Sequence, residues 1–132
     1  MNVTDLDGKT SKLKLMGYTV GIQNRDSRSK YHIAARKLLK EKYPTLQILE
    51  EVSIKIRQGE TLYLDFYIPI LNYAIEVHGE QHYKFSPHFH GSHMGYLKQL
   101  KRDREKNEWC EINNIEFTVL AYDELDEWNA QI

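Results

Sequence analysis

Three successive strand-like stretches constrain the fold of this chain most strongly. Stretches 46–56, 62–68 and 73–78 are rich in Ile, Val, Leu, Tyr and Phe, the residue types that favour β-strands. The polar segment RQGE at 57–60 lies between the first two stretches and predicts a hairpin turn. A sheet built from these strands must bury its apolar surface against a second layer, so helices are required as well.

Helical patterns flank the three stretches. Apolar residues recur at helical spacing over 29–42, and Pro44 ends this run. A long, heavily charged helix is predicted over 94–114, followed by a buried strand over 115–122 and a short acidic terminal helix. The resulting order α, β, β, β, α, β, α predicts an α/β domain with a mixed central sheet flanked by helices.

The length of 132 residues fits one domain with one core. Residues 1–28 are polar and contain glycine, with one short possible strand near 18–22. We therefore expect a loose N-terminal arm over 1–28, followed by a single domain over 29–132.

Composition excludes several classes of protein. Eighteen Lys and Arg against nineteen Asp and Glu exclude a globally basic packaging protein and an acidic tail. The single cysteine, Cys110, excludes a disulfide framework and suits a reducing compartment. The chain has no apolar run long enough to cross a bilayer and no apolar secretory segment. We expect a soluble cytoplasmic protein with no membrane partner and no small-molecule cofactor.

Two carboxylates interrupt the predicted strands. Asp65 lies between Tyr63 and Tyr67, on the face opposite the alternating Leu62, Leu64, Phe66 and Ile68. Asp is depleted in strands, so this position indicates either an exposed face or a functional site. Glu76 lies in the apolar run AIEV, where an unpaired carboxylate would cost several kcal/mol. Glu76 therefore belongs either to a structural ion pair or to a functional site, and His78 shares its face.

A third misplaced charge lies in the long helix. At about 100° per residue, Asp103 falls on the stripe predicted to face the core, with Lys106 beside it. A charge on such a stripe requires a partner or a metal ion. The predicted stripe consists of Tyr96, Leu100, Asp103, Asn107 and Cys110.

These groups fit phosphodiester hydrolysis. Two carboxylates on adjacent strands can hold Mg²⁺, with Mn²⁺ as a substitute, and the cation polarises the phosphate and lowers the pKa of water. A neutral histidine can orient that water or accept its proton, because the ordinary pKa of histidine lies near operating pH.

The motifs resemble a nuclease family. Asp65 followed by Glu76, Val77 and His78 resembles the PD-(D/E)XK nuclease core, with His78 where the usual lysine stands. The run AIEVHGEQHY and the later KRDREKNEWCEINNIEFTVLAY are similar to the branch that contains very-short-patch repair endonucleases and the EDxHD homing endonucleases of phages. The resemblance covers roughly residues 29–122 and implies a restriction-endonuclease-like core.

The resemblance also implies a role for each residue. Asp65 would be the principal metal ligand and Glu76 the second acidic ligand. His78 or His82 would handle the water, with Asp103 supporting the histidine, and we favour His82 as the base because the turn before it lets its ring reach the helix. The DNA contacts would come from Arg28, Lys30, Arg36, Lys37, Gln81, Lys101, Arg102 and Lys106.

The sequence departs from this family at two points. Members of the branch often carry a Glu in the first helix, where this chain offers His32 and, near the helix end, Glu41. Glu50 or Glu51 on the following strand are further substitutes. The repair enzymes also carry a cysteine and histidine zinc site, which one cysteine cannot build, so we expect no structural zinc of that kind.

Other interpretations stay open at this stage. The basic residues of the first helix fit a solvated face as well as phosphate contacts. The segment SPHFHGSHMGY fits a DNA-facing loop, but the histidines His82, His88, His90 and His93 also fit a metal site.

We expect a Mg²⁺-dependent DNA endonuclease of a phage or mobile element, acting in homing, repair or branched-DNA cleavage, in the bacterial host cytoplasm if phage-encoded. DNA is the expected partner and a homodimer is possible. The alternatives are a catalytically inactive nuclease fold that binds DNA or protein, and a histidine-bound zinc protein.

Overall fold

The computed structural model describes residues 1–20 and 29–132. A five-stranded sheet has the strand order β3-β4-β5-β6-β7. Its neighbours pair antiparallel except β6 and β7, which pair parallel. The strands are β1 Asn2–Thr4, β2 Thr10–Lys12, β3 Tyr18–Thr19, β4 Leu49–Arg57, β5 Glu60–Ile68, β6 Tyr73–His78 and β7 Glu116–Ala121. The helices are α1 Lys30–Lys42, α2 Pro87–His90, α3 His93–Ile112 and α4 Trp128–Gln131, with short 3₁₀ turns η1 Pro69–Leu71, η2 Glu80–His82 and η3 Leu125–Glu127.

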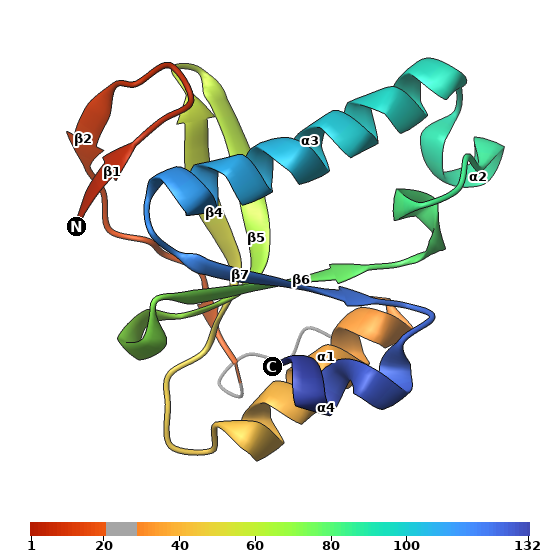
Figure 1. Cartoon of the computed structure of the whole chain (residues 1–132), viewed down its shortest axis with the longest axis horizontal. Helices are drawn as coiled ribbons and strands as arrows, with labels where there is room; N and C mark the ends of the chain where they lie inside the picture. The colour runs from red at the N-terminus through yellow and green to blue at the C-terminus, as the bar shows by residue number, and fades with distance from the viewer. Residues whose placement is uncertain (21–28) are drawn as a thin grey trace.

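The sheet lies between two layers of helices. Figure 1 shows α3 on one side of the sheet and α1 with α4 on the other. One apolar cluster joins Trp109 and Cys110 of α3 to β4 and β5, and a second joins Leu39 of α1 and Trp128 of α4 to β6 and β7. The predicted α/β architecture with a mixed, helix-flanked sheet is confirmed, with element ends shifted by up to three residues.

Helix α1 forms where the sequence predicts it. The Ser29 hydroxyl caps the helix by accepting a hydrogen bond from the backbone N–H of His32 at 3.2 Å. Pro44 follows the last turn and has no N–H to continue it. The buried residues are His32, Ala35 and Leu39, which share one face at helical spacing. A histidine therefore occupies the apolar stripe of α1.

Helix α3 is rotated slightly from the predicted position. The helix starts at a Ser92 cap and buries Glu105, Trp109 and Cys110. Asn107, predicted to face the core, is exposed, so the predicted stripe is wrong there. Asp103 of the predicted stripe and Lys106 beside it are largely covered, as predicted, and Lys106 takes the inward position that was predicted for Asn107 because the helix is rotated by about one residue.

The loose arm predicted over residues 1–28 is wrong for its first 20 residues. Strands β1 and β2 form an antiparallel hairpin, and Val3 and Leu15 are buried in the α3-side cluster. Asn113 after α3 fixes the hairpin, since its side-chain oxygen accepts from the N–H of Thr4 at 2.7 Å and its amide donates to the Thr4 carbonyl at 2.9 Å. This N-terminal segment has too few apolar residues to show a period in the sequence. Its order comes from contacts with distant parts of the chain.

The short strand predicted near 18–22 is present as Tyr18–Thr19, which pairs with β4. Val20 continues the strand region, since its N–H donates to the carbonyl of Ile48 at 2.9 Å. Positions 21 and 22 of that prediction, and Arg28, lie outside the described residues.

The long hairpin β4–β5 changes face near Asp65. Leu64 and Tyr67 belong to the α3-side cluster, whereas Phe66 belongs to the α1-side cluster, so strict alternation breaks between them. Opposite this point Glu51 of β4 has φ of 55°, an uncommon value for a residue with a side chain. The alternative of an exposed face around Asp65 does not hold at Tyr67, which is buried because helices cover both sides of the sheet.

Among the described residues, no helix is both long enough and apolar enough to span a lipid bilayer.

Candidate active site

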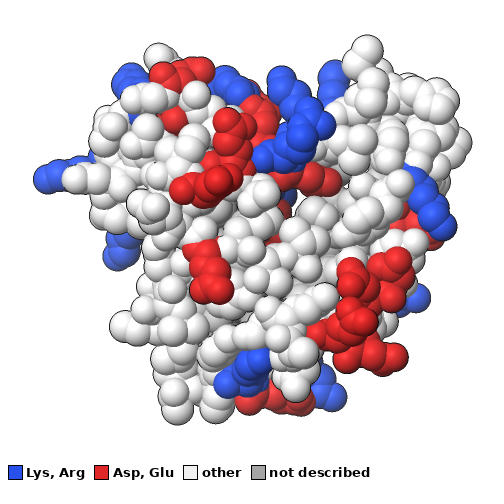
Figure 2. All heavy atoms as spheres, viewed as in Figure 1, with Lys and Arg blue, Asp and Glu red and all other residues white. Residues whose placement is uncertain are grey.

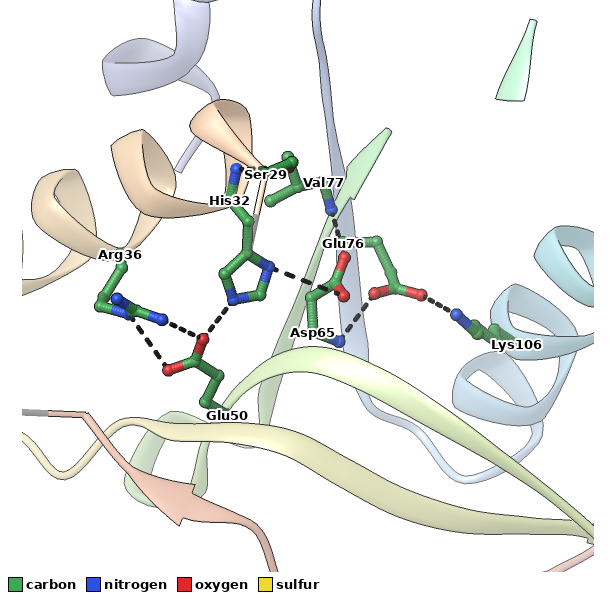
Figure 3. A network of polar contacts seen from close by, with 8 residues as sticks. All are labelled: Ser29, His32, Arg36, Glu50, Asp65, Glu76, Val77 and Lys106. Carbon is green, nitrogen blue, oxygen red and sulfur yellow. Dashed lines mark hydrogen bonds and ion pairs between the residues drawn. The ribbon is translucent and has the colours of Figure 1, made fainter. Parts of the chain in front are cut away.

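Strands β5 and β6 stop pairing through their backbones at Asp65 and Glu76. The last backbone pair is Phe66 with Ile75. Beyond it the N–H of Asp65 donates to Oε2 of Glu76 at 2.7 Å, and the N–H of Val77 donates to Oδ2 of Asp65 at 2.8 Å (Figure 3). Each carboxylate therefore takes the place of a ladder hydrogen bond on the opposite strand and is held in a fixed position.

Lys106 of α3 reaches into this fork. Its Nζ lies 2.7 Å from Oε1 of Glu76, and the two side chains are 16% and 1% exposed (Figure 3). Burial opposes the charge of Lys106, but the carboxylates of Glu76 and Asp65 outweigh it and raise the pKa of the ammonium. Lys106, predicted as a DNA contact, is instead turned toward the acidic pair.

The two carboxylates differ in their protonation. Burial, and then the negative charge of Asp65, raise the pKa of Glu76 well above its usual value. Burial also acts against ionisation of Asp65, but hydrogen bonds from Glu76 and from the N–H of Val77 lower the pKa of Asp65 overall. Asp65 is therefore the more acidic of the two carboxyl groups, and Glu76 is the one that takes up a proton more readily.

A buried network from α1 and β4 supports Asp65. Arg36 donates from Nη2 to Oε1 of Glu50 at 2.7 Å and from Nε to Oε2 at 3.2 Å. Nε2 of His32 hydrogen-bonds to Oε1 of Glu50, and His32 Nδ1 lies 3.9 Å from Oδ1 of Asp65 (Figure 3). His32 is also fixed by stacking on Phe66. Burial opposes ionisation of Glu50, but Arg36 and His32 lower its pKa overall.

This network contains two of the residues that could replace the Glu often found in the first helix of the resembled nuclease branch. Of the residues considered there, His32 faces Asp65, and Glu50 contacts Asp65 only through His32. Glu41 is exposed near the far end of α1. The first helix thus contributes the imidazole of His32 to the site, and the carboxylate of Glu50 contacts that imidazole from its other side.

A second cluster joins His78, His82 and Asp103. His82 Nδ1 donates to Oδ2 of Asp103 at 2.8 Å, and His78 Nε2 lies 3.9 Å from Oδ1 of Asp103. The two imidazole rings stack at 4.1 Å between centroids with 5° between their planes. Burial, and then the neighbouring His82, lower the pKa of His78 to about 4, so this ring is neutral at pH 7.

Asp103 in this cluster is ionised and braced. Burial raises its pKa, but the hydrogen bond and the electrostatic interaction with His82 lower the pKa overall. Gln99, one turn earlier in α3, donates from Nε2 to Oδ1 of Asp103 at 3.0 Å. The sequence analysis missed Gln99, although its i, i+4 spacing from Asp103 is a detectable signal.

The acidic pair and the histidine cluster meet at one cavity of about 250 Å³. The predicted residues Asp65, Glu76, Gln81 and His82 all line it, while His78 and Asp103 lie behind His82. Two lining residues have a different role from the predicted one. Lys106 was predicted as a DNA contact, and His32 only as a substitute for the Glu of the first helix. The remaining lining residues are Ser29, His32, Val77, Gly79 and Lys106.

The predicted DNA contacts are spread over several surfaces. Arg36 is turned toward Glu50, so the basic residues of α1 do not form one exposed stripe. Figure 2 shows Lys and Arg side chains interleaved with Asp and Glu rather than gathered in one large field. The exposed members of the predicted set are Lys30, Lys37, Lys101 and Arg102.

The loop histidines do not assemble the alternative metal site. The ring of His90 accepts from the N–H of Ser86 at 2.9 Å and donates to the carbonyl of Gln81 at 2.8 Å, so backbone groups occupy both nitrogens. His93 stacks on Phe85. Within residues 1–20 and 29–132, the histidine-containing group that could hold a metal is His78 with His82 and Asp103.

Comparisons with known proteins find relatives in viruses. The chain is 39% identical over 61 residues to uncharacterized protein 307L of Invertebrate iridescent virus 6, covering 46% of this chain and 31% of that protein. It is 30% identical over 64 residues to uncharacterized protein 033L of Invertebrate iridescent virus 3, covering 48% of this chain and 33% of that protein. The aligned part of the chain thus spans about a third of each relative. No family model and no solved structure matches the chain.

Proposed function

We propose that the protein is a metal-dependent DNA endonuclease that hydrolyses phosphodiester bonds, built on a restriction-endonuclease-like core. The observation that carries the proposal is the fork between β5 and β6, where buried Glu76 lies beside the largely covered Asp65 and Lys106. Two adjacent carboxylates with so little exposure are costly without a function, because burial and mutual repulsion oppose ionisation of both. The sequence motif around these residues resembles the PD-(D/E)XK core, which supports the same reading.

The donor set fits a divalent cation. Asp65 and Glu76 offer carboxylate oxygens, the ligands that Mg²⁺ and Mn²⁺ prefer. A cation held there would polarise the scissile phosphate and lower the pKa of an attacking water. His32 Nδ1, 3.9 Å from Asp65, lies where it can serve as a third donor, and a nitrogen donor favours Mn²⁺ over Mg²⁺.

His82 is the candidate general base. Asp103 is ionised and accepts a hydrogen bond from His82 Nδ1–H, and with the proton held on Nδ1 a neutral His82 ring presents an unprotonated Nε2 that can accept a proton. His82 lines the cavity together with Asp65 and Glu76. His78, neutral and stacked on His82, restricts how that ring can turn.

Lys106 supplies the positive charge of the site. Its ammonium pairs with Glu76 in the free protein, and on this proposal it would be available to the phosphate or the water if a cation were held by Glu76. Holding the water or the phosphate is the usual role of the lysine in the PD-(D/E)XK motif. In this chain the lysine comes from α3 instead of from β6. Exposed Lys30, Lys37, Lys101 and Arg102 are candidates for backbone contacts to DNA.

The decisive experiment is cleavage of supercoiled plasmid with Mg²⁺ or Mn²⁺, with and without EDTA. We expect nicked or linear product only with the cation, and none from Asp65→Asn. The matched control is Asp123→Asn, a change of the same chemistry on the exposed turn after β7. Cleavage by Asp65→Asn at the wild-type rate would refute the assignment, and DNA binding without cleavage would favour an inactive nuclease fold.

A further inference from the structure

We propose that His78, His82 and Asp103 form a second cation site, distinct from the Asp65 and Glu76 pair, that binds a transition-metal ion such as Zn²⁺. Each of the three residues offers one donor atom, and these atoms all lie within 4.8 Å of one another. The residues come from β6, η2 and α3, elements that the sheet and its covering helix hold together.

The distances between the donors are close to those that zinc requires. Bonds of about 2.0–2.2 Å in a tetrahedral site place neighbouring donors roughly 3.3 Å apart. His82 Nδ1 and Asp103 Oδ2 are 2.8 Å apart, slightly too close, and His78 Nε2 and Asp103 Oδ1 are 3.9 Å apart, slightly too far. These two distances involve different oxygens of Asp103, and a set of one donor per residue lies within 4.8 Å. Approaches of roughly 1.5 Å or less, with a tilt that breaks the parallel stack of the rings, would bring three such donors to the spacing that zinc requires.

The chemistry of the donors selects the class of metal. Two imidazole nitrogens and one carboxylate oxygen suit Zn²⁺ and related transition metals, whereas Mg²⁺ prefers oxygen alone. Gln99 donates to Asp103 from behind, the kind of outer contact that orients a metal ligand.

A metal ion bound at this site would change which ring nitrogen of His82 carries the proton. Metal binding at Nδ1 requires the proton there to leave, and the neutral ring then carries its proton on Nε2. Nε2 is the atom that the proposed general base uses, so bound Zn²⁺ would abolish its ability to accept a proton. On the proposed function, Zn²⁺ is therefore an inhibitor, while its binding stands independently of any cleavage activity.

The test is Zn²⁺ titration of the full chain against a chromophoric chelator, in the absence of DNA. We expect one Zn²⁺ per chain, retained in excess Mg²⁺. His82→Gln and Asp103→Asn should each weaken binding by more than the roughly 10–100-fold typical of losing an outer contact, and Gln99→Ala by about that range. Asp103→Asn is nearly isosteric and keeps a hydrogen-bonding side chain, and circular dichroism melts confirm that each variant is folded.

Two control variants separate this site from its neighbours. The pair His88→Gln and His93→Gln removes exposed loop histidines, and Asp65→Asn with Glu76→Gln removes the acidic pair. Both should retain Zn²⁺ at wild-type affinity. Binding lost in either control, or unchanged in His82→Gln and Asp103→Asn, would overturn the proposal. Failure of plasmid cleavage would instead bear on the nuclease assignment alone, since the titration involves no DNA.

Discussion

Arg36→Met and Lys106→Met should differ sharply in their effect on stability, although each removes a cation from a buried glutamate. Glu50 has a lowered pKa and stays ionised, so Arg36→Met leaves an anion 3% exposed with His32 as its remaining partner. Breaking a buried pair of this kind costs about 3–5 kcal/mol. Glu76 has a raised pKa and can take up a proton when Lys106 is lost, so Lys106→Met costs only the lost contact, about 1–3 kcal/mol.

The pH dependence of the stability loss tests whether Glu50 is ionised in the folded protein. Because the folded-state pKa of Glu50 is depressed, its contribution is present above its unfolded pKa and is lost as pH falls through the folded value. The excess destabilisation of Arg36→Met should therefore be full at pH 7 and shrink in acid. Urea unfolding at several pH values measures both variants, and 3 kcal/mol corresponds to a midpoint shift of about 1.5 M at a slope of about 2 kcal/mol/M. Equal losses for the two variants at pH 7 would refute the assignment of charges.

Further predictions concern the proposed reaction. Asp65→Asn should abolish Mg²⁺-dependent plasmid nicking while the melting curve stays within a few degrees of wild type. His82→Ala should lower the single-turnover cleavage rate by roughly 10² to 10⁴, and Asp103→Asn should cause a similar loss, with metal affinity measured separately; normal rates in both would remove the histidine from the mechanism. Lys37→Gln should reduce the slope of log affinity for DNA against log salt by about one unit, and an unchanged slope would make Lys37 part of a solvated face. Cation binding should release a proton from Glu76, whose pKa is raised, so affinity for Mg²⁺ should increase with pH and calorimetric heats should depend on the ionisation enthalpy of the buffer.

The local elements were predictable because each shows its own period. The helical spacing before Pro44 predicts α1, and the alternating or continuous apolar stretches predict β4, β5 and β6. Asp65 and Glu76 were detectable as candidates for the same reason, since a carboxylate inside a strand-like apolar stretch is unusual whatever its spatial neighbours are. The N-terminal hairpin was not predictable, because Val3 and Leu15 gain their burial only from contacts with distant parts of the chain.

Which charges meet was decided by the tertiary structure. The parallel pairing of β6 with β7 requires a crossover, and α3 within that crossover brings Lys106 to Glu76 and Asp103 to His82. The break in alternation near Asp65 and the packing of α1 place His32 beside it. A sequence period reports only which face of one element is buried, whereas contacts between elements depend on strand order, register and helix rotation. The single residues Lys106 and His32 therefore received their positions in the site only when the chain was folded.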